Sequence, residues 1–169
     1  MKVIEYAIML AMALLSIASS ARSAHEAASW NSIHLTARAV IEAGALAQTR
    51  AHSPEIRNLG RLVVRDISEL DRRLAALAAK AGIQLASGPI PGKIQLTELG
   101  GLHGGIFDRK FLNFNYGASE ALLHHMRDAE GPPGRSALHE LVAIFGPIVR
   151  QDQFLSDWCL AHCLPRKNP

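Results

Sequence analysis

The chain has 169 residues, of which 49% are hydrophobic and 20% are charged. This composition is sufficient for one globular domain with an apolar core. The formal net charge is +3, and basic and acidic residues are interspersed along the chain. No basic cluster alternates with aromatic residues, so the composition argues against a nucleic-acid-binding surface.

The first 23 residues have the pattern of a secretory signal peptide. Lys2 precedes an uncharged apolar run, residues 6–18, and small residues follow that run. The run is shorter than the roughly 20 residues that a membrane-spanning helix needs. Cleavage after Ala21 or after Ser23 satisfies the small-residue rule. We therefore expect removal of residues 1–23 during export to the periplasm, and an uncleaved N-terminal anchor is the alternative.

The domain that we expect at residues 24–164 begins with a helix of small residues. From Trp30 to Ala51, apolar or small residues recur at steps of three and four, which predicts a helix, with residues 24–29 as a frayed lead. Its inner face is mostly small, so we expect close packing against the next helix. The short turn at His52 then favours an antiparallel hairpin.

The strongest helical pattern runs from Ser53 to Gly82. Ser53 is a good N-cap, and Pro54 suits the first turn of a helix. Gly82 can take the left-handed conformation that ends a helix. Because its apolar residues form one stripe, this helix requires partner helices to cover it. The stripe consists of Ile56, Leu59, Val63, Ile67, Leu70, Leu74 and Leu77.

A helix-breaking connection follows at residues 83–93, which contain Pro89 and Pro91-Gly92. Residues 94–99 are expected to form a short helical turn. The glycines of residues 100–105 match neither the Walker nor the dinucleotide fingerprint and follow no strand. A plain loop is therefore favoured there over a phosphate site.

Two further helices are predicted, from Ile106 to Asp128 and from Ser136 to His162, the second with a kink at Pro147. Residues 165–169 form a tail. The inner face of the third helix contains Phe107, Phe111, Phe114, Ala118, Ala121 and His125. That of the fourth contains Leu138, Leu141, Phe145, Ile148, Asp152, Leu155, Cys159 and His162. No segment alternates with period two, so we predict an all-α, antiparallel four-helix bundle with a short extra helical turn between its second and third helices.

Several short motifs point to a known family. They include Ser53-Pro54-Glu55-Ile56 and Val63-Val64-Arg65-Asp66 in the second helix, Phe107-Asp108-Arg109 in the third, and Pro147 in the fourth. With the signal peptide and the helix order, this combination resembles the bacterial family called domain of unknown function 4142. The resemblance covers residues 30–162. It implies a ferritin-like helical bundle exported to the periplasm or outer envelope, and it implies no reaction.

The chain departs from that family at three positions where members often carry histidine. An Asp-His pair of the second helix corresponds to Asp66-Ile67 here, a second pair to Ala118-Ser119, and a histidine of the fourth helix to Asp152. Any role that those histidines share is therefore lost in this chain. No Glu-x-x-His motif occurs either, which disfavours a carboxylate-bridged di-iron centre.

The segment Cys159-Leu160-Ala161-His162-Cys163 is the sharpest candidate for chemistry. On a helix, residues three and four apart share a face, so both thiols and the imidazole converge. Such ligands suit copper(I) or zinc. Two other interpretations stay open: a disulfide formed in an oxidising compartment, or thiols that are simply buried.

Two further groups on the inner faces are titratable. Asp152 lies on an apolar stripe, where an unpaired carboxylate is costly. It is therefore either a ligand-binding or proton-handling acid, or a structural carboxylate that pairs with an arginine or reaches the bundle rim. Neighbouring helical residues point about 100° apart, so His124 and His125 do not chelate together. We expect His125 to be a core or boundary residue and His124 to be exposed.

These features favour an exported, non-enzymatic helical-bundle protein of the cell envelope, an interaction or stress-related module with protein partners there and no cofactor. No serine, histidine and acid spacing singles out a catalytic triad, and no catalytic residue is predicted. The alternative is a copper- or zinc-binding protein that uses Cys159, His162 and Cys163.

Overall fold

The computed structural model describes the backbone of residues 2–130 and 138–164 and the side chains of residues 26–129 and 138–164. This part of the chain is helical and contains no strand, which confirms the all-α prediction. None of its helices is long and apolar enough to cross a membrane. The helices are α1 (Lys2–Arg50), α2 (Pro54–Lys80), α3 (Lys93–Gly100), α4 (Gly104–Glu130) and α5 (His139–His162).

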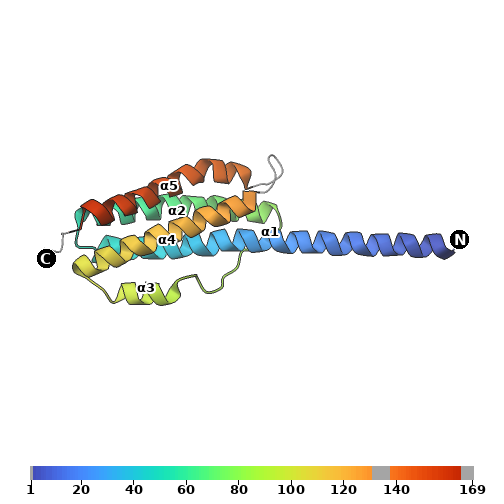
Figure 1. The fold of residues 1–169 in the computed structure, drawn as a ribbon, viewed down its shortest axis with the longest axis horizontal. Coiled ribbons are helices and arrows are strands. Elements are labelled where there is room, and N and C mark those ends of the chain that lie inside the picture. The colour runs from blue at the N-terminus through green and yellow to red at the C-terminus, as the bar shows by residue number, and fades with distance from the viewer. Residues whose placement is uncertain (1, 131–137, 165–169) are drawn as a thin grey trace.

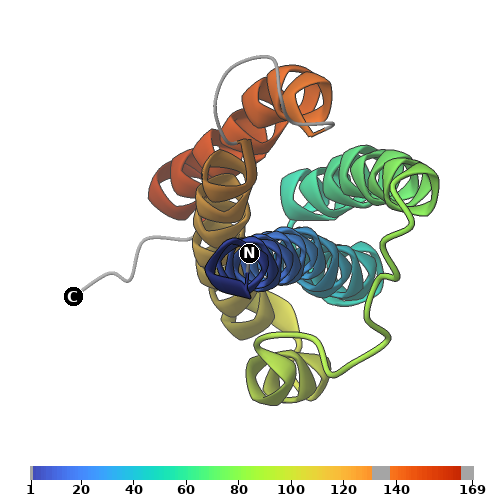
Figure 2. The ribbon, with the colours of Figure 1, turned by 90° about the vertical axis from the view of Figure 1, so that its right-hand side faces the viewer.

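The four long helices lie side by side, and α3 lies outside them (Figure 1). Helix α1 packs against α2 and α4, and α5 packs against the same two helices. Each of these neighbouring pairs runs antiparallel. The connection from α2 to α4 returns along the whole assembly, so α2 and α4 run in the same direction. In the end-on view, α3 lies beneath α1 and α4 (Figure 2).

Helix α1 is longer than the sequence pattern predicts. Residues 24–29 are helical rather than frayed, so that prediction is wrong. Three of these six residues are alanine, the residue with the highest helix propensity, and they favour continuation of the helix. The expected cleavage positions after Ala21 and Ser23 lie within α1, and processing there stays a prediction.

The predicted close approach of α1 and α2 is confirmed at two glycines. A Cβ atom added to Gly60 would lie 2.8 Å from the carbonyl oxygen of Gly44 and 2.8 Å from the Cβ of Ala47. A Cβ atom added to Gly44 would lie 2.9 Å from Cγ2 of Val64. The two helix backbones are therefore too close at this level to accept a side chain between them.

Helix α2 matches its prediction closely. The Oγ of Ser53 accepts a hydrogen bond from the backbone N–H of Glu55 at 3.2 Å. Gly82 has a φ of 69° beyond the last helical residue, as expected for a helix end. Of the seven predicted stripe residues, Leu77 is half-buried, and the other six are buried: Ile56, Leu59, Val63, Ile67, Leu70 and Leu74.

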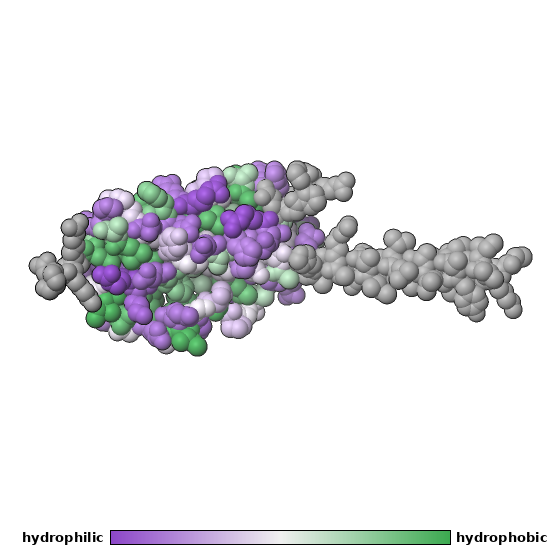
Figure 3. Space-filling view, in the orientation of Figure 1, coloured by the Kyte–Doolittle hydropathy of each residue, from purple (hydrophilic) through white to green (hydrophobic). Residues whose placement is uncertain are grey.

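The short helical turn predicted at residues 94–99 is helix α3. It buries Leu96 and Leu99, while Ile94 is 74% exposed and Ile106, at the start of α4, is 68% exposed. Apolar residues also gather at this end of the molecule in the space-filling view (Figure 3). The loop between α3 and α4 includes Gly104, whose φ is 64°.

The inner face of α5 differs from the predicted one. Val149 and Ser156 are buried, whereas Ile148 and Leu155 are only half-buried and His162 is exposed. The contact with α2 and α4 therefore follows a stripe rotated by one position over part of the helix. Ser136, the predicted first residue, lies outside the described residues. Pro147 lies inside α5, on its exposed side.

We expect Gly60→Ala to destabilise the protein by about 1–2 kcal/mol. The added methyl group meets backbone in the α1–α2 contact, and overpacking costs more than the roughly 1 kcal/mol of helix propensity gained. Gly117→Ala is the matched control, because no atom outside its own helix lies within 4 Å of its added Cβ, and it should stabilise the protein. Urea unfolding measures the free energy of unfolding of both variants, provided that its dependence on urea concentration is the same as in the parent. Equal effects of the two substitutions would contradict the close contact.

Candidate functional site

The turn between α1 and α2 is held by Asp108 of α4. Its carboxylate accepts hydrogen bonds from the backbone N–H groups of His52, at 2.8 Å, and Ser53, at 3.0 Å. Asp108 is only 1% exposed, so these charge-assisted bonds are shielded from water. They fix the beginning of α4 against the end of α1 and thereby set the register of the two antiparallel helices.

A groove of about 370 Å³ lies where α3 and the residues before it meet α1 and α4. We call it the α3 groove. Residues from three segments that are distant in the sequence line it, and Figure 2 shows α3 placed against both long helices. The lining residues are Thr36, Ala39, Pro91, Gly92, Gln95, Asn113, Phe114, Gly117, Ala118, Ala121 and His125.

The polar lining residues gather at the two ends of the α3 groove. On α4 the lining includes Asn113 and His125, twelve residues and about 18 Å apart along the helix axis. Gln95 lines the groove near the first of these ends, because it also shares an adjoining groove with Asn113 and Phe114. The contact between His52 and Asp108 puts these two residues at the same level of the bundle. Thr36 is sixteen residues before His52 along α1, and His125 is seventeen residues after Asp108 along α4. Since the two helices are antiparallel, Thr36 lies opposite His125 at the other end of the groove.

The floor of the α3 groove is made of small residues. Gly117, Ala118 and Ala121 of α4 lie between the two polar ends. A glycine inside a helix costs about 1 kcal/mol relative to alanine, and a Cβ atom added to Gly117 would meet nothing within 4 Å. Packing against other residues therefore does not explain this glycine, which leaves the floor open.

The α3 groove is electrically neutral. None of its described lining residues is Lys, Arg, Asp or Glu. Desolvation, and to a lesser extent the neighbouring His124, lower the pKa of His125 below its usual value, which favours the uncharged imidazole. His125 is half-buried and His124 is exposed, as predicted.

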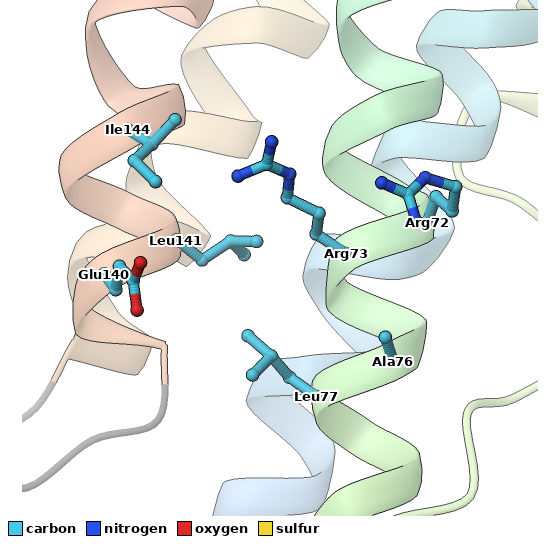
Figure 4. Close-up of a pocket in the computed structure, with 7 residues that line it drawn as sticks. All are labelled: Arg72, Arg73, Ala76, Leu77, Glu140, Leu141 and Ile144. Atoms are coloured by element: carbon cyan, nitrogen blue, oxygen red, sulfur yellow. The ribbon is translucent and has the colours of Figure 1, made fainter.

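A smaller groove of about 180 Å³ separates α2 from α5. In Figure 4, Arg73 extends from α2 towards Leu141 and Ile144 of α5. Its guanidinium lies 5.5 Å from the ring centroid of Phe145 and bonds to Glu69 at 2.8 Å. The cation of Arg73 is therefore already balanced by contacts within the protein.

Asp152 lies in the core rather than in either groove. It is 3% exposed, and its Oδ2 has no hydrogen-bond partner among the described residues. Burial, together with the nearby carboxylate of Asp66, raises the pKa of Asp152 to about 7. Arg65 opposes this shift only weakly, because its guanidinium bonds to Asp66, with Nε at 2.7 Å from Oδ1.

A chain of hydrogen bonds beside Asp152 joins α4 to α5. The Ser156 hydroxyl donates to the Asp152 carbonyl oxygen at 3.0 Å, so it accepts from the Asn115 Nδ2 at 2.9 Å. This direction leaves Oδ1 of Asn115 buried and without a partner in the described structure. The amide oxygen of Asn115 can only accept, and so can the ionised carboxylate of Asp152, so this part of the core is short of hydrogen-bond donors when Asp152 is ionised.

Sequence reasoning missed the buried Asn115 and Ser156, and it placed Ala118 rather than the buried Ser119 on the inner face of α4. Their spacing of four on α4, and of four from Asp152 on α5, is the signal that could have located them. The three positions at which the resembling family often carries histidine, Ile67, Ser119 and Asp152, are also buried.

The structure brings together the two thiols of the predicted metal face but not the imidazole. The Cys163 thiol donates to Sγ of Cys159 at 3.0 Å, and burial, then this bond, raise the pKa of Cys159 to about 12. The Nδ1 of His162 instead bonds to the Trp158 carbonyl oxygen at 2.9 Å, and the two rings stack. No group of three or more His, Cys, Asp or Glu residues in the described ranges could hold a metal ion.

These observations define an all-α protein whose long antiparallel helices carry a neutral groove on one face and a polar group inside. Residues 13–150 match the sequence profile of the family described as domain of unknown function (DUF4142). The chain belongs to this family. Comparison with curated proteins and with solved structures finds no match.

The stability of the protein should depend on pH through Asp152. Because its folded pKa is raised from 3.8 to about 7, the unfolded chain loses this proton first, and stability falls as pH rises between these values. Asp152→Asn does not titrate, so it should be about as stable as the parent at pH 4 and more stable than the parent at pH 8, by on the order of 4 kcal/mol. Urea unfolding across this range measures the difference.

The matched control for this prediction is Asp157→Asn, which removes an exposed carboxylate from the same helix. This variant separates the effect of burial at position 152 from the loss of one negative charge on α5. A parallel pH dependence of the two variants would show that Asp152 does not titrate as described.

Proposed function

We propose that the protein is an exported, non-enzymatic binding module of the cell envelope, built on a ferritin-like antiparallel four-helix bundle. Two observations support the fold. Helices α1, α2, α4 and α5 each pack against two antiparallel neighbours, and one long connection joins α2 to α4. A single long crossover is the connectivity of ferritin-like bundles. The signal-peptide pattern of residues 1–23 supports export.

The α3 groove is the observation that carries the binding function. Its volume of about 370 Å³ lies within the range of small-molecule sites, which combine an apolar lining with a few polar groups. It collects residues from α1, α3 and α4, and its neutral polar groups suit recognition better than acid–base chemistry. Membership of a family with no established reaction is compatible with this function.

The uncharged dye Nile red should bind the α3 groove of the purified protein, with a rise in its fluorescence. Gly117→Leu should abolish this rise, because the new side chain fills the floor at a position with open space above it. Glu120→Leu is the matched control: it adds leucine at an exposed α4 position outside the groove lining. Fluorescence titration at equal protein concentration gives the affinities.

Two results would contradict a binding site in the α3 groove. One is an unchanged Nile red affinity in the Gly117→Leu variant. The other is an equal loss in both leucine variants, which would show that the dye responds to the surface of α4 in general. Thermal unfolding of each variant confirms that the fold is retained.

A second candidate function is thiol-based binding of copper or zinc. It is supported by the contact between Cys159 and Cys163, whose sulfur atoms lie 3.0 Å apart. His162 would have to leave its bond to Trp158 to join them. Since positions four apart on a helix approach the limit for a disulfide, oxidation in the periplasm competes with metal binding.

Intact and native mass spectrometry of protein recovered from the periplasm tests export and thiol state together. We expect a chain that begins at residue 22 or 24, without bound metal, and lighter by two hydrogens before reduction than after it. A full-length mass would contradict cleavage. One copper or zinc ion per chain, lost in the Cys159→Ser variant, would favour the second function over the first.

A further inference from the structure

We propose that the α3 groove binds an uncharged chain molecule that carries a hydrogen-bonding group at each end. This inference rests on the binding function proposed above and names the class of ligand. It follows from three properties of the lining: the separation of its polar groups, the size of the residues between them, and the absence of charge among the described lining residues.

The first property is the arrangement of hydrogen-bonding groups. Gln95 and Asn113 lie at one end of the α3 groove, and Thr36 and His125 lie at the other. Each end therefore offers two side chains that can donate or accept. A ligand with a polar group at each end can bond to both pairs, and each additional hydrogen bond contributes modestly to binding.

The second property is the shape of the middle. Gly117 and Ala121 are spaced by one helical turn and present almost no side chain, with Ala39 of α1 beside them. Phe114 closes one end under Gly92, where a Cβ atom would lie 2.9 Å from the ring. The floor is thus low and apolar over Gly117, Ala118 and Ala121, within a lining that extends about 18 Å from Asn113 to His125. A single flexible chain covers such a floor more completely than a compact ring system.

The third property is charge. Transfer of an ionised group from water into this partly apolar groove is costly unless an opposite charge meets it. Beside Gln95 and Asn113, the adjoining groove is lined by Glu98 and Lys110, which bring charges of opposite sign. Lys93, at the start of α3, pairs with Glu42 at 3.2 Å. The hydrogen-bonding groups of the ligand are therefore neutral, as in hydroxyl or amide groups.

The test is displacement of Nile red by chains of equal length with different ends. Decanediol, with a hydroxyl at each end, should displace the dye at a concentration about tenfold lower than decanedioate or decanediamine, and about tenfold lower than decanol. Equal displacement by the charged chains would overturn the inference about charge. Equal displacement by decanol would overturn the inference about two polar ends.

The His125→Leu variant separates recognition from structure. It should remove the roughly tenfold preference for decanediol over decanol, whatever the change in the affinity for Nile red, because the second hydroxyl loses its partner at that end. Similar losses for all three molecules would indicate a purely structural role for His125. If Gly117→Leu leaves the Nile red signal of the parent unchanged, the proposed binding function itself is refuted. If the dye binds in the groove but the four chain molecules displace it equally, only the proposed ligand class is refuted.

Discussion

The carboxylate of Asp108 holds the arrangement of the helices on which both the core and the α3 groove depend. By accepting the N–H groups of His52 and Ser53, it joins the first residues of α4 to the turn between α1 and α2. Backbone N–H groups at such a turn lack partners within the helices, so a buried carboxylate satisfies them and also sets where α4 begins. The levels of Thr36 and His125 follow from that register.

The close approach of α1 and α2 acts on the same arrangement from the other side. Because Gly44 and Gly60 place no side chains between these helices, α1 and α2 pack closely, and the turn that Asp108 binds lies at the end of that pair. Helix α4 is therefore placed by a polar contact at one end and by apolar packing of Phe107 and Phe111 next to it. This combination fixes both position and direction.

The interior of the bundle is not apolar throughout. Apolar residues occupy α2 throughout, whereas the facing part of α4 and α5 contains Asn115, Ser156 and Asp152. Two buried oxygen atoms there have no described partner, which costs stability that apolar residues of similar size would not lose. The cost falls where α5 meets α2 and α4, and it makes this seam the part of the core most sensitive to protonation.

The sequence predicts the parts of the fold that local pattern determines and misses those that depend on several helices at once. The stripe of α2 and the small inner face of α1 follow from periodicity and residue size, and both are confirmed. The buried face of α5 is not predicted correctly, because the apolar Ile148 and Leu155 fit a helical stripe as well as Val149 and Ser156 do. Only packing against α2 and α4 distinguishes the two stripes.

The α3 groove lies beyond sequence reasoning for a related reason. Its floor could be read from the spacing of Gly117 and Ala121, but small residues at that spacing also predict a close helix–helix contact, as they do at Gly44. The difference is the position of α3, which is anchored by Leu96 and Leu99 and by Gly92 against Phe114. It covers one end of the α1–α4 face and stops before the small residues. A longer α3 would have covered the floor at Gly117 and Ala121. Because α3 ends before these residues, they line an open groove instead of a close helix–helix contact.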